Sequence, residues 1–351
     1  MKIFLIWDIM NSKEANLLPK LKGESNKIIY WVSWPQGEKY KPSETIFHNL
    51  LDAIPGIPAK GIDMSEFPPP GKDLIERLYK VESLILTMMN RWPGKLHTDE
   101  RKHLYYNMLQ YWCGILKKYK PDVIIHHTIP HDICSYIVYE LGHLLNIKTI
   151  MFEDAKVSDR VLTYSDFWRG SDDLRKELQK NQNKNFSLED LGKDLQEYYK
   201  LQTDPNRDAT PVYIDILKNQ YSKSNLLVHR LKRLKNYLKN ENILQLIIQS
   251  INSRFKQNLK KEYNSVQIKP DFRKSDFLNK KFIYVPLHLQ PELSTSPLGD
   301  IFVDQILMIE TLSASLPPGW IIYVREHPLQ WIRRRNILCV PNDRNSRSSF
   351  P

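Results

Sequence analysis

The chain has 351 residues and a net charge of +11, with 41% hydrophobic residues and eight Trp. This composition excludes a disordered protein, and the length exceeds one typical hydrophobic core, so two domains are expected. Its three Cys have neither metal-ligand spacing nor an even count, which excludes a disulfide scaffold and favours a reducing compartment.

The N-terminal apolar run is interrupted at Asp8, which makes it too short for a signal peptide. No later stretch approaches the roughly 20 apolar residues needed to span a bilayer. We therefore expect a cytoplasmic protein that is soluble or bound peripherally to the inner face of the cytoplasmic membrane.

Residues 1–164 predict a Rossmann-like α/β domain. Runs of β-branched and aromatic residues predict strands, and longer apolar-periodic runs predict helices. In chain order these are Ile3–Ile6, Ile28–Val32, Asp73–Met89 (helix), Glu100–Tyr119 (helix), Asp122–Ile125, Ile133–Leu145 (helix) and Lys148–Phe152. The last three form a βαβ unit, with the polar loop His126–Asp132 after its first strand.

Residues 165–280 predict a helical segment between two α/β domains, in which a capping box at Ser187–Asp190 opens a helix. From Lys218 to Lys274 there are fourteen Lys or Arg and three acidic residues, so the net charge of the whole chain is concentrated there. Leucines at helical spacing predict basic amphipathic helices that either pack on a neighbouring domain or dock on an anionic membrane surface or polysaccharide. No recognised motif supports binding to nucleic acid.

Residues 281–332 predict the start of a second α/β domain. Strands are expected at Phe282–Val285 and Ile321–Val324, with the helix Phe302–Leu316 between them. Ligands of open parallel sheets bind beyond the carboxyl ends of the strands. The polar clusters His288–Gln290 and Arg325–Pro328 follow the two strands, so we expect them to converge on one crevice.

Three hydroxyl residues, Ser294, Thr295 and Ser296, precede a helix expected to start near Gly299. A helix N-terminus attracts anions, so these hydroxyls are candidates for binding phosphate or sugar oxygens, and turn formation is the alternative. The chain has neither a Walker loop nor the glycine fingerprint of dinucleotide-binding proteins, which argues against a P-loop NTPase and a standard NAD enzyme.

Pro328 holds His327 in extended geometry just beyond a strand. Beside Arg325 and facing Gln290, this histidine is a candidate donor to a leaving phosphate, and a structural loop histidine is the alternative.

The C-terminal motifs carry a resemblance to a known family. They are Tyr284–Glu292, Ser294–Pro297, Val303–Gln305 and Val324–Pro328. This part of the chain resembles bacterial capsular and surface polysaccharide biosynthesis proteins, which are similar to GT-B glycosyltransferases of the Kdo-transferase and sialyltransferase neighbourhood. The resemblance is weaker over residues 122–159, which look like the acceptor-side domain of that family.

The resemblance implies transfer of a sugar, Kdo or sialic-acid-like, from a CMP-sugar to a glycan or glycolipid acceptor. His327 and Pro328 would contact the donor phosphate, and neither a metal nor another cofactor is expected. A carboxylate would take the proton of the acceptor hydroxyl. Asp132 is the first candidate, with a role as helix N-cap as its structural alternative, and Asp8 and Glu153–Asp154 are the other candidates. Glu292 would act in catalysis or hold a donor hydroxyl.

Seventy-one residues run from Lys281 to Pro351, fewer than the roughly 100 to 150 of a typical domain. Residues 333–351 lack periodicity and predict a disordered tail. We therefore expect a truncated second domain and an activity that is weak or absent without a partner chain. Two other classes stay open: another nucleotide-sugar enzyme, such as a UDP-sugar epimerase, and a non-catalytic scaffold of a polysaccharide assembly complex.

Overall fold

A computed structural model describes residues 1–23, 25–91, 96–155, 157, 160–207, 281–327 and 330. The basic window Lys218–Lys274, the predicted tail at 333–351 and Pro328 lie outside these residues. One compact unit contains Met1–Phe186, Tyr284–Pro318 and Ile322–Glu326. The other described residues, including helix α9 (Lys193–Thr203), belong to a second unit.

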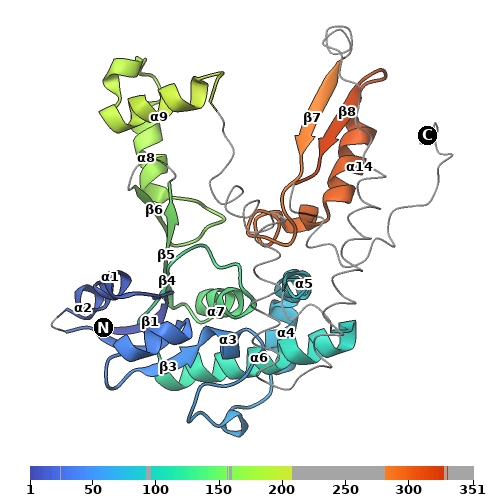
Figure 1. The fold of residues 1–351 in the computed structure, drawn as a ribbon. Helices are drawn as coiled ribbons and strands as arrows, with labels where there is room; N and C mark the ends of the chain where they lie inside the picture. The colour runs from blue at the N-terminus through green and yellow to red at the C-terminus, as the bar shows by residue number, and fades with distance from the viewer. Residues whose placement is uncertain are drawn as a thin grey trace, which may run out of the picture. The chain divides into compact units, whose positions relative to one another are not determined.

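The first unit is built on a six-stranded sheet with the order β3-β2-β1-β4-β5-β6. All neighbouring strands are parallel except β5 and β6, which are antiparallel. This order, up to β5, is that of a Rossmann sheet, so the predicted α/β class is confirmed (Figure 1). The strands are β1 (Lys2–Ile6), β2 (Lys27–Ser33), β3 (Ile46–Asn49), β4 (Val123–His126), β5 (Lys148–Asp154) and β6 (Val161–Tyr164).

Both faces of this sheet are buried because alternate side chains of each strand enter different hydrophobic clusters. On β1, Phe4 belongs to one cluster, and Ile3 and Leu5 belong to the other. Leu18 of α2 covers the face of Leu5, whereas Ile137 of α7 covers the face of Phe4. The helices of this domain are α1 (Ser12–Ala15), α2 (Leu17–Lys22), α3 (Leu50–Ala53), α4 (Lys72–Arg77), α5 (Tyr79–Met88), α6 (Thr98–Tyr119) and α7 (Ile133–Leu144).

Three details of the domain differ from the sequence-based expectation. The helix expected over Asp73–Met89 is broken at Leu78, whose φ of −110° and ψ of 17° are not helical. His126 was expected in a loop but is the buried last residue of β4. Short strands β3 and β6 were not predicted, because four residues carry too little alternation to stand out.

A buried series of hydrogen bonds links residues of β2, β3 and α6. His48 Nε2–H donates to the carbonyl of Ile57 (2.8 Å), so its Nδ1 accepts from the hydroxyl of Tyr30 (2.7 Å). The hydroxyl of Tyr111 donates to Tyr30 (2.7 Å) and accepts from the N–H of Ala59 (2.9 Å). Every polar group in this series of hydrogen bonds therefore has a partner while the His48 ring is neutral.

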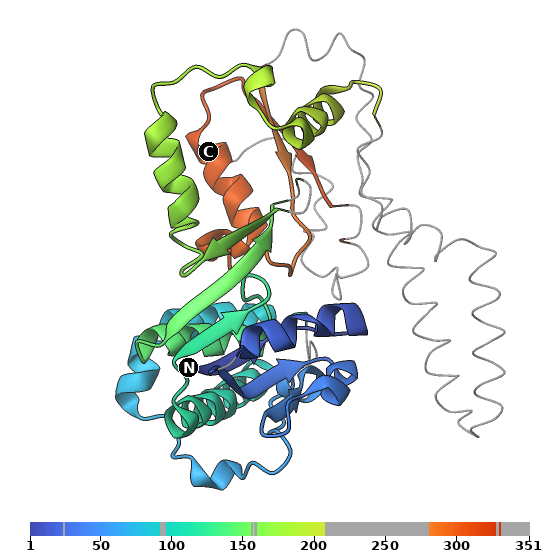
Figure 2. The ribbon, with the colours of Figure 1, turned by 90° about the vertical axis from the view of Figure 1, so that its left-hand side faces the viewer.

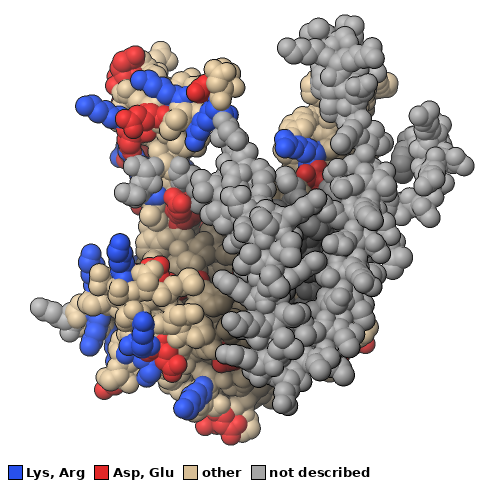
Figure 3. Space-filling view, viewed as in Figure 1, with Lys and Arg blue, Asp and Glu red and all other residues tan. Residues whose placement is uncertain are grey.

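The polar segment after β6 is helical, as predicted, in the part that the structure describes. It contains α8 (Asp172–Asn181) and α9. The expected capping box at Ser187 is present, but it opens only the short 3₁₀ helix Leu188–Asp190. On the face shown in Figure 3, Lys and Arg of the described residues are interspersed with Asp and Glu.

The C-terminal βαβ segment consists of β7 (Phe282–Pro286), α14 (Gln305–Ser315) and β8 (Ile321–Arg325). The N–H of Ile321 donates to the carbonyl of Lys281 (3.0 Å), and the N–H of Leu287 donates to that of Arg325 (2.8 Å). The two strands therefore run in parallel, as predicted, and α14 runs alongside them (Figures 1 and 2).

The helix of this segment starts later than expected. The chain forms a 3₁₀ helix over Asp300–Val303, and α14 begins at Gln305 with Asp304 as its N-cap. Asp304 Oδ1 accepts the N–H of Ile306 (2.9 Å), which satisfies one of the free N–H groups of the first turn. Within the described residues, no helix is both long and apolar enough to cross a membrane.

We predict that the free energy of unfolding decreases as the pH falls from about 6.5 to about 4. Burial lowers the pKa of His48 from 6.5 to about 4, so below pH 6.5 the unfolded chain takes up a proton that the folded chain excludes. At about pH 4 the free energy of unfolding has decreased by roughly 3 kcal/mol. Urea unfolding at several pH values measures it.

The matched variants are His48→Gln and His103→Gln, the latter on the exposed face of α6. Burial lowers the pKa of His126 to about 3, which adds a contribution of the same sign. His48→Gln should therefore flatten the pH dependence without abolishing it, and His103→Gln should leave it unchanged. An unaltered slope in His48→Gln would contradict the assignment.

Candidate active site

The parallel sheet has a switch point between β1 and β4. The chain leaves β1 towards α2 on one face and leaves β4 towards α7 on the other. In open α/β sheets the crevice at such a point, beyond the carboxyl ends of the strands, is the usual ligand site. Asp8 follows β1 and His127 follows β4, so both lie at this point.

The backbone on either side of the switch point is fixed by hydrogen bonds that continue the sheet. The N–H of His127 donates to the carbonyl of Ile6 (2.9 Å), which extends the pairing of β4 with β1. The N–H of Ile9 donates to Oγ of the buried Ser33 (3.0 Å). Asp8 therefore lies between two anchored residues, Ile6 and Ile9, which restrict the position of its backbone.

Asp8 is the centre of an electrostatic cluster. Burial raises the pKa of the Asp8 carboxyl, and the charge of Asp132 raises it further. His127, whose Nε2 lies 3.5 Å from Asp8 Oδ2, opposes this shift, as does a hydrogen bond from the side chain of Trp34. A partly desolvated carboxylate beside a histidine is suited to accept and return a proton.

Aromatic rings border this cluster. The ring of Trp7 lies 6.2 Å from that of His127 and 5.5 Å from that of Phe152, between centroids. Ligand sites of this kind combine apolar surface with a few oriented polar groups. Rings beside carboxylates suit a substrate that has both apolar faces and hydroxyl groups, as a sugar has.

Asp132 lies in the same cluster but also has a structural role. It is the N-cap residue of α7, where its N–H donates to Ser135 Oγ (3.2 Å) and its carbonyl accepts from that hydroxyl (3.0 Å). Glu153 and Asp154 were expected just after a strand, but both belong to β5, where they pair with Leu162 and Val161. Among the candidate bases, Asp8 therefore lies at the switch point, is partly buried and has His127 as a partner.

The loop after β7 forms a compact turn. The hydroxyl of Thr295 accepts from the N–H of Glu292 (3.0 Å) and donates to its carbonyl (2.9 Å). The N–H of Ser296 donates to the same carbonyl (2.8 Å), and both hydroxyl residues are buried. Since α14 begins at Gln305, Ser294, Thr295 and Ser296 lie in the turn that precedes it and not in its first turn.

Gln290 and the buried Gln305 hold this loop together. Gln290 Nε2 donates to the carbonyl of Val303 (2.6 Å). Gln305 Oε1 accepts from the N–H of His288 (2.7 Å), and its Nε2 donates to the carbonyl of the same residue (3.0 Å). The amide of Gln290, which was expected to bind a donor, is engaged within the protein.

The second polar cluster follows β8, beside the end of β7. The carbonyl of Arg325 accepts the N–H of Leu287, so the two strand ends meet at one edge, as predicted. His327 comes two residues after Arg325, and its carbonyl accepts the N–H of Gln330 (2.9 Å). Its neighbour Pro328 is outside the described residues.

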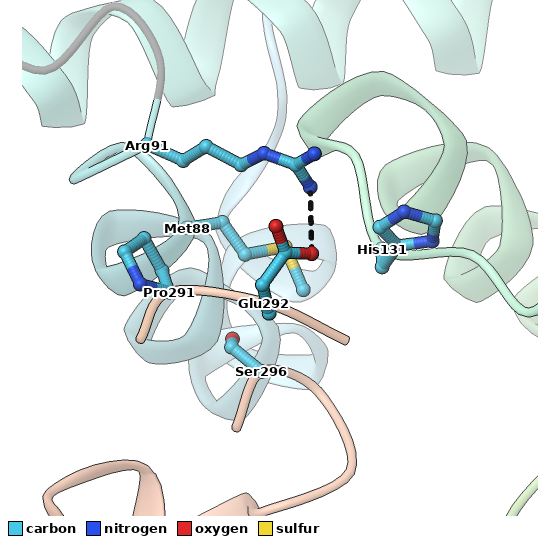
Figure 4. Close-up of a pocket in the computed structure, with 6 residues that line it drawn as sticks. All are labelled: Met88, Arg91, His131, Pro291, Glu292 and Ser296. Atoms are coloured by element: carbon cyan, nitrogen blue, oxygen red, sulfur yellow. Dashed lines mark ion pairs between the residues drawn. The ribbon is translucent and has the colours of Figure 1, made fainter. Parts of the chain in front are cut away.

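A small pocket in the first unit brings the loop after β7 to α5 and to the loop before α7 (Figure 4). Arg91 Nη1 lies 3.5 Å from Glu292 Oε2, and His131 borders them. The pocket has room for about one water molecule. Its lining residues are Met88, Arg91, His131, Pro291, Glu292 and Ser296.

Arg91 is the residue of this pocket that sequence reasoning missed. It follows the end of α5, where a basic residue is common at any helix terminus and carries no functional signal. Within the described residues, no group of three or more His, Cys, Asp or Glu side chains is arranged to hold a metal ion.

No protein-family model matches the chain, and no curated protein matches it. Among solved structures, it is similar to the UDP-GlcNAc 2-epimerase of Neisseria meningitidis bound to UDP-GlcNAc, at 12% identity and a TM-score of 0.21, over 95% of this chain and 68% of that chain. It is also similar to the UDP-GlcNAc 2-epimerase of Methanocaldococcus jannaschii, at 13% identity and a TM-score of 0.22, over 95% of this chain and 67% of that chain. Likeness at this level does not define a shared activity.

We predict that Asp8→Asn increases the free energy of unfolding at pH 7 by roughly 1 kcal/mol, because it removes a charge that burial disfavours. The raised pKa of Asp8 means that its ionisation opposes folding, so the gain is present at neutral pH and disappears at acidic pH. Thermal unfolding at pH 7 and pH 4 measures both values.

Asp73→Asn is the control, because Asp73 is exposed on α4 and its change should stay within about 0.5 kcal/mol. A loss of stability in Asp8→Asn at pH 7 would show that its carboxylate is a structural partner instead.

Proposed function

We propose that this protein is a nucleotide-sugar-dependent glycosyltransferase of capsular or surface polysaccharide biosynthesis, with the two-domain GT-B arrangement. The observation that carries the proposal is the partly buried Asp8 carboxylate beside His127 at the switch point of a Rossmann-like sheet. The C-terminal motifs that resemble the Kdo-transferase and sialyltransferase neighbourhood support a CMP-sugar as donor.

In this proposal the first domain binds the acceptor glycan or glycolipid. The acceptor hydroxyl oxygen forms a bond to the anomeric carbon of the donor sugar while Asp8 takes the hydroxyl proton. We assign the base to Asp8 rather than Asp132, because Asp8 is partly buried at the switch point and lies beside His127. His127 stabilises the ionised form of Asp8 before the reaction.

The bond that breaks joins the anomeric carbon to the phosphate oxygen of the donor, and the nucleotide leaves with the electron pair. Positive or hydrogen-bonding groups are needed where that charge develops. His327 and Arg325 at the end of β8 are our candidates, together with Pro328 and the hydroxyls of the loop after β7. No metal or other cofactor enters this scheme.

A nucleotide panel in thermal unfolding tests the donor class. We predict that CMP raises the melting temperature by about 2 to 4 °C at a concentration 100-fold above its Kd. His327→Ala should abolish the shift. Protection by UDP-sugars alone would favour an epimerase-type enzyme over our proposal. No protection by any nucleotide, with binding to anionic vesicles, would favour a scaffold.

A transfer assay with CMP-sugar donors tests the base. Asp8→Asn should lower kcat by roughly 10² to 10⁴, because it removes the proton acceptor without changing shape. Asp132→Asn should have a smaller effect, since Asn is also a good N-cap. Equal losses in both variants, or a larger loss in Asp132→Asn, would return the role of base to Asp132.

A further inference from the structure

Two polar atoms of the pocket in Figure 4 are buried without a hydrogen-bond partner among the described residues: Arg91 Nη1 and Ser296 Oγ. Ser296 is only 2% exposed. Leaving such buried groups unsatisfied is costly, so proteins retain them where water or a ligand binds.

The groups that converge here are suited to an anion. Arg91 supplies a permanent positive charge and a planar set of N–H donors, which match phosphate oxygens. Ser296 supplies a hydroxyl donor. His131 Nδ1–H donates to the carbonyl of Ile129 (2.8 Å), which leaves Nε2 for a ligand and as a donor when the ring is protonated.

An anion already lies beside Arg91 in the free protein, namely the carboxylate of Glu292. The separation of 3.5 Å between Arg91 Nη1 and Glu292 Oε2 is long for a hydrogen bond, and Nη1 makes none. The backbone of Glu292 is fixed by the turn with Thr295, and its side chain extends from this turn into the pocket beside Arg91.

We propose that Arg91, Ser296 and His131 form a phosphate-binding subsite, which the Glu292 carboxylate occupies as an internal competitor. The site is small in the free protein because Glu292 lies in it, and phosphate binding requires this side chain to rotate away. Assigning the phosphate to a nucleotide-sugar donor rests on the proposed function, whereas the anion site itself does not.

The location agrees with that assignment. His131 lines the pocket and is followed by Asp132, and the charges of both residues act on the Asp8 carboxyl. A phosphate held by Arg91 would therefore lie next to the carboxylate cluster that we assign to the acceptor. Glycosyl transfer requires this proximity between the proton acceptor and the leaving group.

Isothermal titration of the full chain with inorganic phosphate, CMP and cytidine tests the subsite. Arg91→Gln should weaken phosphate and CMP binding at least about tenfold, the usual effect of losing a charged hydrogen bond. Glu292→Gln should tighten both severalfold, because it removes the competing charge and keeps the shape. Glu76→Gln, an exposed residue of α4, is the charge-matched control and should change neither.

Ser296→Ala separates a binding role from a structural one. Removing an unpartnered buried hydroxyl should leave the melting temperature of the free protein unchanged or higher. The same variant should weaken phosphate binding. Arg91→Lys keeps the charge but not the planar donors, so we expect an intermediate loss, and it carries the test if Arg91→Gln does not fold.

The outcomes distinguish this inference from the proposed function. CMP binding that is unaffected by Arg91→Gln and Glu292→Gln would overturn the subsite and leave the transferase proposal standing. Phosphate binding that depends on Arg91, with CMP no tighter than phosphate, would support the anion site and overturn its assignment to a CMP-sugar. Phosphate binding that is absent from both the original protein and Glu292→Gln would overturn the subsite.

Discussion

The pairing of β1 with both β2 and β4 is the constraint on which the first domain depends. β1 is parallel to both neighbours, and its side chains alternate between the two hydrophobic clusters. Since crossover helices must cover both faces of such a sheet, the chain leaves β1 and β4 in different directions. The position of Asp8 beside His127 follows from this topology, because each residue is the first or second after its strand.

The ionisable groups of the core differ from those of the loops in burial and in hydrogen bonding. In the core, Tyr30, Tyr111 and His48 are satisfied as neutral groups by a chain of hydrogen bonds. In the loops, the ionisable groups of the Asp8 cluster and of the Arg91 pocket are only partly buried, and their ion pairs are 3.5 Å long. The first arrangement stabilises the fold, and the second leaves groups available for chemistry.

Most of the regular structure could be predicted because the parallel strands are continuous apolar runs and α6 and α7 have long helical periodicity. Strand β3 was missed because it has four residues, two of them His48 and Asn49. The break at Leu78 was missed because apolar spacing continues across it. Tertiary packing decides such details, and periodicity does not report it.

The candidate site was predictable where it depends on strand ends and unpredictable where it depends on contacts. Asp8 and Asp132 could be named because parallel strands present their carboxyl ends at one edge. The choice between them required the partial burial of Asp8 and its contact with His127, which arise only on folding. Arg91 could not be named, since its partner Glu292 is far along the chain and the pairing arises only on folding.

The two hydrogen bonds between the Gln305 amide and the backbone of His288 have a mechanical consequence. Gln305 is the first residue of α14. Its amide therefore connects this helix directly to the loop that carries Glu292 and Ser296. The outer surface of this helix exposes Ile306 and Leu307, at 56% and 45% of their areas. A displacement of α14 by anything bound on that surface would be transmitted through one buried amide to the loop beside Arg91.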